Sequence, residues 1–406
     1  MKAEVYFFTA HSQSYKESMS KVKGPLALEK IGIKNKIKKD NKIVIKTHFG
    51  ALENTRYLRP SYIRFLCDYV KELGAIPSVA ESCGWGLPED ISGVHTEYSG
   101  RANEEEYLKV ALMHGFTLET MGAPILMLDG SNGIDYEIQP IDGNLLKKVF
   151  VAGRLREFDY MILATHFKGH LGAGFGGALK NLGIGCVAKG QKIRAHLGTM
   201  FDYDLSKCIE DCDKCITVCP TGALSKSGNN ILKKDWDKCR YCYMCRSICD
   251  KGVINTGSTT TEDFIYRFID NAKGVVDYFG KKKIFYINYA IDITWQCDCG
   301  SSDVPFIPDI GVLSSMDPVA LDQACIDLAH GSLKSPNSIL SEVKNLPINE
   351  SYDWFSYIPR FTSGELDLNF EGKQSKSWEI QLKAAEKIGL GSRDYNLIQV
   401  KIENNT

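Results

Sequence analysis

The residues with the clearest chemistry are cysteines, of which the chain has 14. Eight of them lie between Cys208 and Cys249 in two runs, with two or three residues between neighbours in each run. Thiols at such spacing converge on a metal centre, whereas a disulfide framework is typical of short secreted chains. The pattern therefore predicts metal ligation in a reducing compartment, and we expect a cytoplasmic protein.

The two runs have the spacing of a two-cluster ferredoxin. In that arrangement three cysteines of a run bind one [4Fe-4S] cluster, and the fourth binds the other cluster. The first run has an extra residue between Cys208 and Cys212, and Asp250 stands where the second run would have proline. Zinc in two four-cysteine sites is the alternative, although zinc sites usually pair short motifs across a longer spacer. The crossing predicts two ligand sets, which are Cys208, Cys212, Cys215 and Cys249 for cluster 1, and Cys239, Cys242, Cys245 and Cys219 for cluster 2.

A second set of polar residues follows two expected strands, 42–47 and 160–165, each of which runs into Thr-His-Phe. A glycine-rich segment, 172–177, comes after the second strand and matches G-x-G-x-x-G. No acidic residue follows at the spacing of a ribose contact, so we expect no nicotinamide cofactor. Glycines let a backbone approach an anion closely, while lysine and histidine supply positive charge. The alternative is that the glycine-rich segment only forms a contact between a helix and the sheet, with its lysines in solvent. The pattern predicts that an anionic substrate is bound by Lys46, His48, His170, Gly174, Gly176, Lys180 and Asn181.

Two further cysteines, Cys297 and Cys299, follow a strand expected at 283–292. Two thiols with one residue between them suit a further metal ion, a redox disulfide or a thiolate nucleophile. Burial in the core, as for many free cysteines, is the remaining alternative. We assign the catalytic roles to these two cysteines together with His166 and Lys168.

Strands and helices alternate along the chain, which predicts an α/β fold with a mainly parallel sheet and helices on both faces. In such sheets ligands bind at the carboxyl ends of the strands, where the polar residues described above fall. Apolar periodicity predicts strands at 42–47, 75–80, 124–128, 148–152, 160–165 and 283–292, and helices at 61–73, 104–114, 318–329 and 378–388, with caps at Ser61, Asn103 and Asp317.

The cysteine runs interrupt this α/β pattern. We expect a small α+β ferredoxin-like module at 206–255, inserted between two parts of one α/β domain, 1–205 and 256–335. A C-terminal extension, 336–406, is expected to pack on that domain. Because an inserted module is tied to the domain at both ends, this arrangement favours electron transfer within the chain.

The overall charge narrows the range of partners. The chain of 406 residues has 49 Lys and Arg against 50 Asp and Glu, a net charge of −1. The protein as a whole therefore lacks the positive electrostatic field that is typical of nucleic-acid-binding proteins. The apolar run near the N-terminus is too short for a signal peptide or a membrane span. We expect an anionic small molecule and a redox partner protein, a ferredoxin or a reductase, and neither nucleic acid nor membrane; the oligomeric state stays open.

Several of these segments carry a resemblance to a known family. They are Lys46-Thr-His48, the segments 165–170 and 176–183, the cysteine runs, Cys297-Asp-Cys299 and the segment 315–322. On these segments, which span residues of about 40 to 330, the chain resembles the iron–sulfur-centre proteins grouped as domain of unknown function 362, with an inserted bacterial-type ferredoxin. The resemblance implies the fold and the clusters but no reaction.

Together the residues predict an iron–sulfur oxidoreductase. In this hypothesis two [4Fe-4S] clusters pass low-potential electrons to an unidentified small anionic substrate in the α/β domain. The alternative is a non-catalytic ferredoxin-like electron carrier, or a partner in cluster delivery or maturation, whose large domain is a docking platform. A carrier needs no polar pocket, so the residues at the strand ends discriminate between the two hypotheses.

Overall fold

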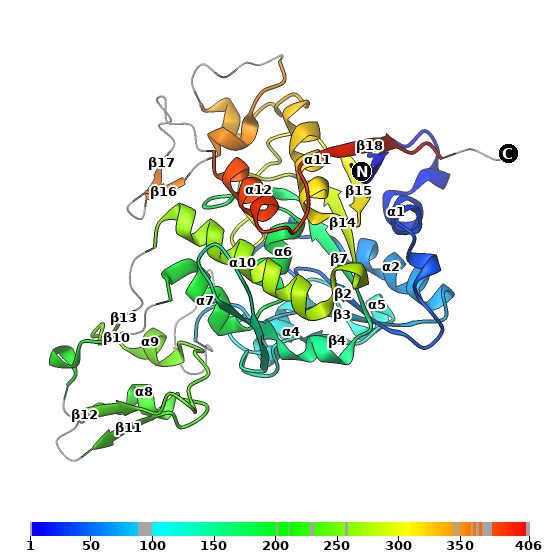
Figure 1. The fold of residues 1–406 in the computed structure, drawn as a ribbon. Coiled ribbons are helices and arrows are strands. Elements are labelled where there is room, and N and C mark those ends of the chain that lie inside the picture. Colours follow the sequence, from blue (N-terminus) through cyan, green and yellow to red (C-terminus); the bar gives the residue numbers. More distant parts are fainter. Residues whose placement is uncertain are drawn as a thin grey trace.

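An eight-stranded mixed sheet forms the centre of the protein (Figure 1). The computed structural model describes residues 2–87, 100–199, 202–209, 211–227, 231–255, 259–343, 346, 350–358, 360–362, 365–367 and 376–402. Five of the seven neighbouring strand pairs are parallel, which confirms the expected mainly parallel α/β sheet. The strand order is β18 (Tyr395–Gln399), β1 (Ala3–Thr9), β15 (Gly311–Ser315), β14 (Ile284–Ala290), β7 (Tyr160–His166), β2 (Lys42–Lys46), β3 (Ile76–Glu81) and β4 (Ile125–Met127), and β15 runs antiparallel to both of its neighbours.

Helices cover both faces of the sheet, because the side chains of each strand alternate between two apolar cores. In β2, Ile43 and Ile45 belong to one core and Val44 belongs to the other. The core that contains Ile43 also takes in α1 (Gly24–Lys30), α2 (Pro60–Glu72), α4 (Glu104–Met113) and α5 (Leu118–Met121). The opposite core takes in α6 (Ala178–Gly185), α7 (Lys189–Leu197), α10 (Thr261–Phe279), α11 (Pro318–His330) and α12 (Ser377–Lys387) (Figure 1).

Local signals determine where the helices begin. Asp317 accepts two backbone N–H groups at the start of α11, at 2.9 and 3.0 Å, and Asn103 accepts one at the start of α4, at 2.8 Å. The cap expected at Ser61 is wrong, because α2 begins one residue earlier at Pro60 and has no side-chain cap. Proline favours the first helical position, since its fixed φ is helical and its missing N–H is not needed there.

A small α+β segment projects from the body of the molecule, at the lower left of Figure 1. Its two ends pair with each other, β10 (Asp202–Tyr203) antiparallel to β13 (Ile254–Asn255), so both connections to the large domain lie together. Between them lie α8 (Lys214–Thr217), the hairpin β11 (Leu224–Ser227) and β12 (Ile231–Lys234), and α9 (Met244–Ile248). This segment contacts α7, where a Cβ on Gly190 would overlap the carbonyl oxygen of Tyr241.

Six further strands of the described residues form three short hairpins outside the main sheet. The strand expected at 148–152 is one of them, since β6 (Lys148–Ala152) pairs antiparallel with β5 (Tyr136–Pro140). The hairpin β8 (Lys168–His170) and β9 (Gly174–Gly176) holds the glycine-rich segment. A last hairpin, β16 (Arg360–Thr362) and β17 (Glu365–Asp367), lies in the expected C-terminal extension, part of which falls outside the described residues.

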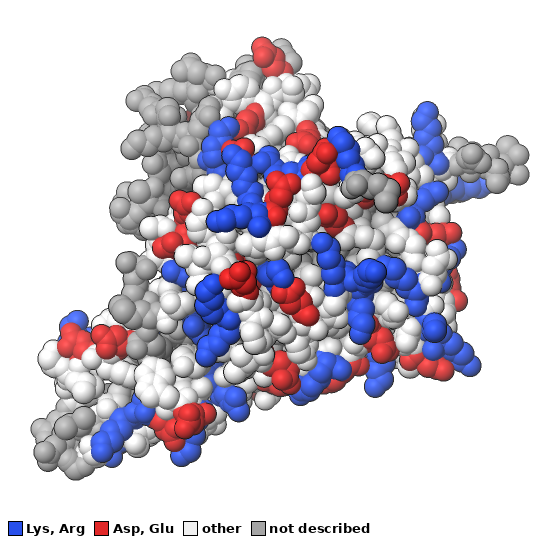
Figure 2. Space-filling model, in the orientation of Figure 1, with Lys and Arg blue, Asp and Glu red and all other residues white. Residues whose placement is uncertain are grey.

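The surface carries both signs of charge. On the face shown in Figure 2, basic and acidic side chains are interspersed, in keeping with the net charge of −1. Within the described part of the chain, no helix combines the length and the apolar composition needed to cross a membrane.

Candidate functional site

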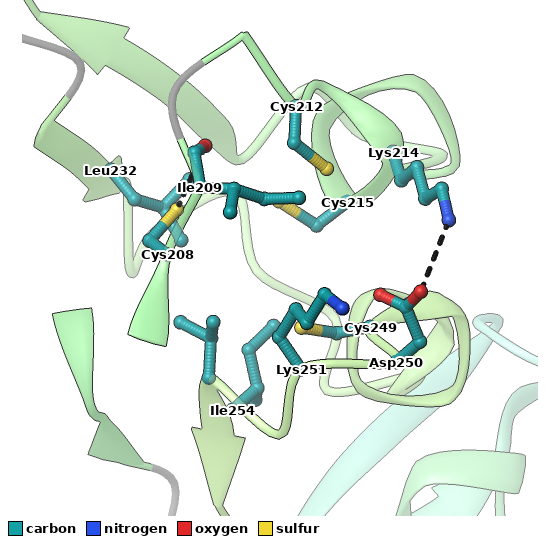
Figure 3. Close-up of a pocket in the computed structure, with 11 residues that line it drawn as sticks. Cys208, Ile209, Cys212, Lys214, Cys215, Leu232, Cys249, Asp250, Lys251 and Ile254 are labelled. Atoms are coloured by element: carbon teal, nitrogen blue, oxygen red, sulfur yellow. Dashed lines mark hydrogen bonds and ion pairs between the residues drawn. The ribbon is translucent and has the colours of Figure 1, made fainter. Parts of the chain in front are cut away.

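Four cysteines line one cavity of about 400 Å³ in the small segment. Cys208, Cys212 and Cys215 come from the first cysteine run, whereas Cys249 follows α9 at the end of the second run. Figure 3 shows their side chains on different sides of the same space. The structure therefore brings together, across the two runs, the four residues predicted for cluster 1.

A second cavity, of about 350 Å³, is lined by the other four cysteines of the runs. Here Cys219 comes from the first run and joins Cys239, Cys242 and Cys245 of the second. Two backbone N–H groups point at thiols in this cavity, that of Ala223 at Cys219 (3.2 Å) and that of Tyr241 at Cys239 (3.4 Å). Hydrogen bonds to the sulfur atoms are one of the means by which proteins tune the potential of an iron–sulfur cluster.

The thiols of the two runs divide into two groups of four, one around each cavity. Among the described residues, no group of three or more His, Cys, Asp or Glu side chains converges closely enough to hold one metal ion. The thiols instead stand around two hollow spaces, four to each, and a four-iron cluster is held by four thiolates spread around it. Tyr241 and Tyr243, beside the second cavity, have positive φ angles of 53° and 60°. Such angles are uncommon for bulky residues and cluster at functional sites.

The carboxyl ends of β2, β3, β7 and β14 meet at one edge of the main sheet. Charged side chains gather at this edge, and we call their cluster the crevice. Lys46 at the end of β2 is fully buried and forms an ion pair with Glu81 at the end of β3, at 3.0 Å. It also donates to Asn181 Oδ1 on α6, at 2.8 Å. Burial opposes ionisation of Glu81, but Lys46 and His48 outweigh it and hold the pKa of Glu81 at about 2. Lys46 is thus committed to protein partners and orders the base of the crevice.

His48 connects this ion pair to a thiol. Its Nδ1 lies 2.9 Å from the hydroxyl of Tyr107 and 3.2 Å from Glu81 Oε1, and its Nε2 lies 3.6 Å from Cys299 Sγ. Burial lowers the pKa of His48, but Cys299 and Glu81 together outweigh burial and raise it above its ordinary value. The imidazole is therefore placed to hold a proton beside the sulfur of Cys299.

Asp298, between the two crevice cysteines, fixes their loop to β7. Its carboxylate accepts from His166 Nδ1 at 3.0 Å and from Lys168 Nζ at 2.9 Å, and its pKa lies far below the ordinary value because these cations outweigh burial. His166 Nε2 meets the carbonyl oxygen of Ile291 at 2.8 Å, so both ring nitrogens face acceptors and none is left for a substrate. The predicted catalytic residues His166 and Lys168 thus position the cysteine loop in this structure.

Cys297 and Cys299 form a polarised thiol pair. The Cys297 thiol hydrogen-bonds Cys299, which lowers the pKa of Cys299 well below that of an ordinary cysteine. Arg101 and His48 add to this effect, and Arg101 also donates to the carbonyl oxygen of Cys299 at 3.4 Å. The pKa of Cys297 is raised correspondingly, because it is the donor of the pair and is buried. Of the two thiols, Cys299 is therefore the one that ionises more readily.

The glycine-rich segment is held between α6 and α12. The N-terminus of α6 is occupied by the buried carboxylate of Asp322, which accepts from Ala178 N and Leu179 N at 2.8 and 2.9 Å. Gly174 has a φ of +82°, and a Cβ there would overlap the backbone of Trp378 on α12. These contacts give Gly174 a packing role, and its predicted contact with a substrate stays a prediction.

Three side chains beside this segment face the crevice. A Cβ on Gly176 would lie 3.6 Å from Lys168 and 3.6 Å from Lys180, which places both lysines beside the glycine. His170 Nδ1 accepts from two backbone N–H groups at 3.1 and 2.9 Å, and burial and Lys180 lower its pKa well below the ordinary value. His170 is therefore neutral and carries its proton on Nε2. Lys180 is half-buried and has no ion-pair or hydrogen-bond partner among the described residues.

Sequence reasoning missed four side chains of this crevice, which are Glu81, Arg101, Tyr107 and Asp298. Glu81 ends a strand that was expected, so its position at the strand end was the available signal. Arg101 and Tyr107 gave no signal, because they reach the crevice from a loop and from α4. Of the remaining cysteines, Cys67, Cys83, Cys186 and Cys325 are buried.

Comparisons with known proteins give one family and two partial similarities. The model of the family described as domain of unknown function (DUF362) matches residues 43–327. The pyruvate synthase subunit PorD of Methanocaldococcus jannaschii is 32% identical over 69 residues, which are 16% of this chain and 79% of that protein. The lactate racemase apoprotein from Thermoanaerobacterium thermosaccharolyticum is similar in structure with a TM-score of 0.34 and 12% identity, over 71% of this chain and 51% of that chain.

Proposed function

We propose a function on the premise that the chain belongs to the DUF362 family, whose description names no reaction. The protein is an iron–sulfur oxidoreductase that passes low-potential electrons from two [4Fe-4S] clusters to a small anionic substrate bound at the carboxyl edge of the main sheet. The observation that carries this proposal is the pair of four-cysteine cavities in a segment that packs directly against the crevice domain. Each bound cluster would supply one low-potential electron at a time.

The charge in the crevice supports an anionic substrate. Its basic side chains outnumber its acidic ones, because Glu81, Asp298 and the Cys299 thiolate face a larger set of cations. Those cations are Lys46, Arg101, His166, Lys168, Lys180 and Lys192. In a partly buried site an excess of positive charge favours an anion, since each interaction is weakly screened there.

Two of the predicted substrate-binding residues are free to meet that anion. The ammonium of Lys180 is half-buried at the crevice and serves as its charge partner. The neutral ring of His170 carries an N–H donor on Nε2, because Nδ1 already accepts two backbone N–H groups. Lys46, Lys168 and His166 keep the surrounding groups in place and do not themselves change partners.

The alternative is an electron carrier that has no small-molecule substrate. Its support is the position of the first cavity, which is rimmed by Ile209, with 50% of its surface exposed, and by the ion pair of Lys214 and Asp250 at 3.5 Å. An exposed rim of apolar and charged groups suits transient contact with a redox protein. The oxidoreductase needs such a contact as well, so this feature alone does not favour the carrier.

The test is reoxidation of photoreduced clusters, followed by absorbance without oxygen, on addition of short-chain carboxylates, phosphate monoesters or inorganic oxyanions. We expect at least one of these anions to reoxidise the wild-type clusters, and Lys180→Met to slow that reaction at least about tenfold, since a charge-assisted contact contributes about 1.5–3 kcal/mol. Lys109→Met is the matched control, because Lys109 is an exposed lysine on α4. If a ferredoxin but no anion reoxidises the clusters, the hypothesis of an electron carrier replaces that of an oxidoreductase.

A further inference from the structure

The loop that carries Cys297 and Cys299 is held rigidly on the side away from the sulfur atoms. Asp298 is 1% exposed, and both of its carboxylate oxygens are bound by cations of β7 and β8. The backbone carbonyl of Asp298 accepts from Ala51 N at 2.8 Å, which ties the loop to the segment after β2 as well. A loop anchored at its central residue keeps the two flanking thiols in one mutual position.

The two sulfur atoms face a set of groups that suits thiol redox chemistry. One residue separates the two cysteines, in a loop whose central residue is held in place. Arg101 lies against Cys299 and His48 Nε2 lies 3.6 Å from its sulfur. A cation beside a thiolate makes it the attacking or leaving group in disulfide exchange, and a neighbouring imidazolium supplies the proton.

A continuous chain of contacts joins this pair to the second cluster cavity. Lys189 on α7 lies close enough to Cys242 for their charges to interact, and Gly190 next to it packs on the backbone of Tyr241. The ammonium of Lys189 donates to the carbonyl oxygen of Ala102 at 2.7 Å. Arg101, the preceding residue, donates to Cys299.

We infer that Cys297 and Cys299 form a dithiol–disulfide couple that collects two electrons from the clusters before they reach the substrate. This inference rests on the proposed function, and it assigns cluster 2 as the cluster that delivers electrons to the crevice. The disulfide would accept two electrons, one from each reduced cluster, and one proton, which His48 is placed to donate to Cys299 and which Cys299 would pass on to Cys297. The S–S bond breaks to leave a thiol on Cys297 and a thiolate on Cys299, and both clusters return to their oxidised state. The substrate is therefore an anion that accepts electrons in pairs.

A reductive titration of the thiol-oxidised holoprotein without oxygen tests the inference. Each cluster takes one electron and a disulfide takes two, so the wild type is expected to take up about four electrons per chain. Cys297→Ser removes the disulfide and is expected to take up about two, with its iron content unchanged. Cys67→Ala is the matched control, because Cys67 is buried in α2, and it should again take up about four.

A second variant tests the route from cluster 2. Gly190→Ala retains all ten relevant cysteines, but its methyl group overlaps the Tyr241 carbonyl oxygen and must displace the small segment from α7. We expect it to take up the same number of electrons as the wild type, with reduction of the disulfide at least about tenfold slower than that of the clusters. Alkylation of the free thiols followed by mass spectrometry of the 297–299 peptide gives the disulfide content directly.

Uptake of about two electrons by the wild type, or equal uptake by the wild type and Cys297→Ser, would overturn the inference. Failure of the proposed function gives a different result. Either the protein would contain no iron, or no anion would reoxidise the clusters although the titration still showed electron uptake by the disulfide. An unchanged rate of disulfide reduction in Gly190→Ala would reject the route through α7.

Discussion

Removal of the carboxylate of Asp298 tests how the crevice is held together. Asp298 is 1% exposed and neutralises two cations, since His166 lies 3.0 Å and Lys168 2.9 Å from its oxygens. In Asp298→Ala both cations lose their counter-ion while they remain 3% and 7% exposed. Breaking a buried ion pair by removal of one partner costs about 3–5 kcal/mol. With two cations left unpaired, we expect a loss at the upper end, about 5 kcal/mol.

The assay is thermal unfolding followed by circular dichroism, at one scan rate and without oxygen, because large proteins often unfold irreversibly. An unfolding entropy of about 2.1 cal/mol/K per residue amounts to about 0.85 kcal/mol/K for 406 residues. The expected decrease in Tm is therefore about 6 °C. Asp298→Ala/Lys168→Met should recover part of this decrease, because it removes one of the unpaired charges. Asp142→Ala is the control, since the Asp142 side chain is 98% exposed and should change stability by no more than about 0.5 kcal/mol. A decrease below about 2 °C in Asp298→Ala would refute this reasoning.

The same carboxylate predicts how stability depends on pH. The pKa of Asp298 in the folded protein lies far below the value of about 3.9 for an unfolded aspartate. Its contribution is therefore complete above about pH 5 and is lost as the pH falls below about 4, because the unfolded chain then binds the proton first. The difference in Tm between the wild type and Asp298→Ala should accordingly shrink on acidification, and a difference that grows instead would contradict the assignment.

Three further predictions concern the cysteines and the glycine-rich hairpin. Alkylation of Cys299 by iodoacetamide should be nearly independent of pH between about 6 and 8, because its pKa is depressed. In Cys297→Ala the rate should rise with pH, because the largest cause of the depressed pKa is lost, and a rising rate in the wild type would show an ordinary thiol. Because Cys249 shares its cavity with Cys208, Cys249→Ala and Cys208→Ala should each abolish the same cluster signal in electron paramagnetic resonance, and loss of different signals would exclude the crossing. Gly174→Ala should lower Tm by several degrees, because its methyl group meets the Trp378 backbone at positive φ, and an unchanged Tm would remove the packing role.

The central strands could be predicted from sequence because they are apolar and end in distinctive polar residues. The expected strand 160–165 is observed as β7, with one more residue at its end, and α11 begins after the predicted cap Asp317. The antiparallel strand β15, its neighbour β1 and the edge strand β18 were not predicted. Their pairing joins residues far apart in the chain, such as Tyr6 with Ser314 and Ala3 with Tyr395, and no local pattern specifies a partner.

The candidate site divides in the same way. The two cysteine sets follow from spacing alone, because short loops fix which thiols can face one another, and each set lines its own cavity. The partners of Lys46 and Lys168 could not be predicted, since Glu81 lies 35 residues further along the chain and Asp298 lies 130. Sequence therefore indicated that lysines gather at this edge, but only the fold shows that protein carboxylates bind two of them.

The most direct test of the account is the content of iron, acid-labile sulfide and zinc per chain, measured on protein purified without oxygen. The account predicts about eight irons and about eight sulfides, since each of two clusters holds four of each. Replacement of Cys297 and Cys299 together should leave both values unchanged, because the account gives these thiols no metal. Two zinc ions without sulfide would contradict the account. A lower iron content in the Cys297/Cys299 double variant would also contradict it, because these two cysteines would then bind a metal.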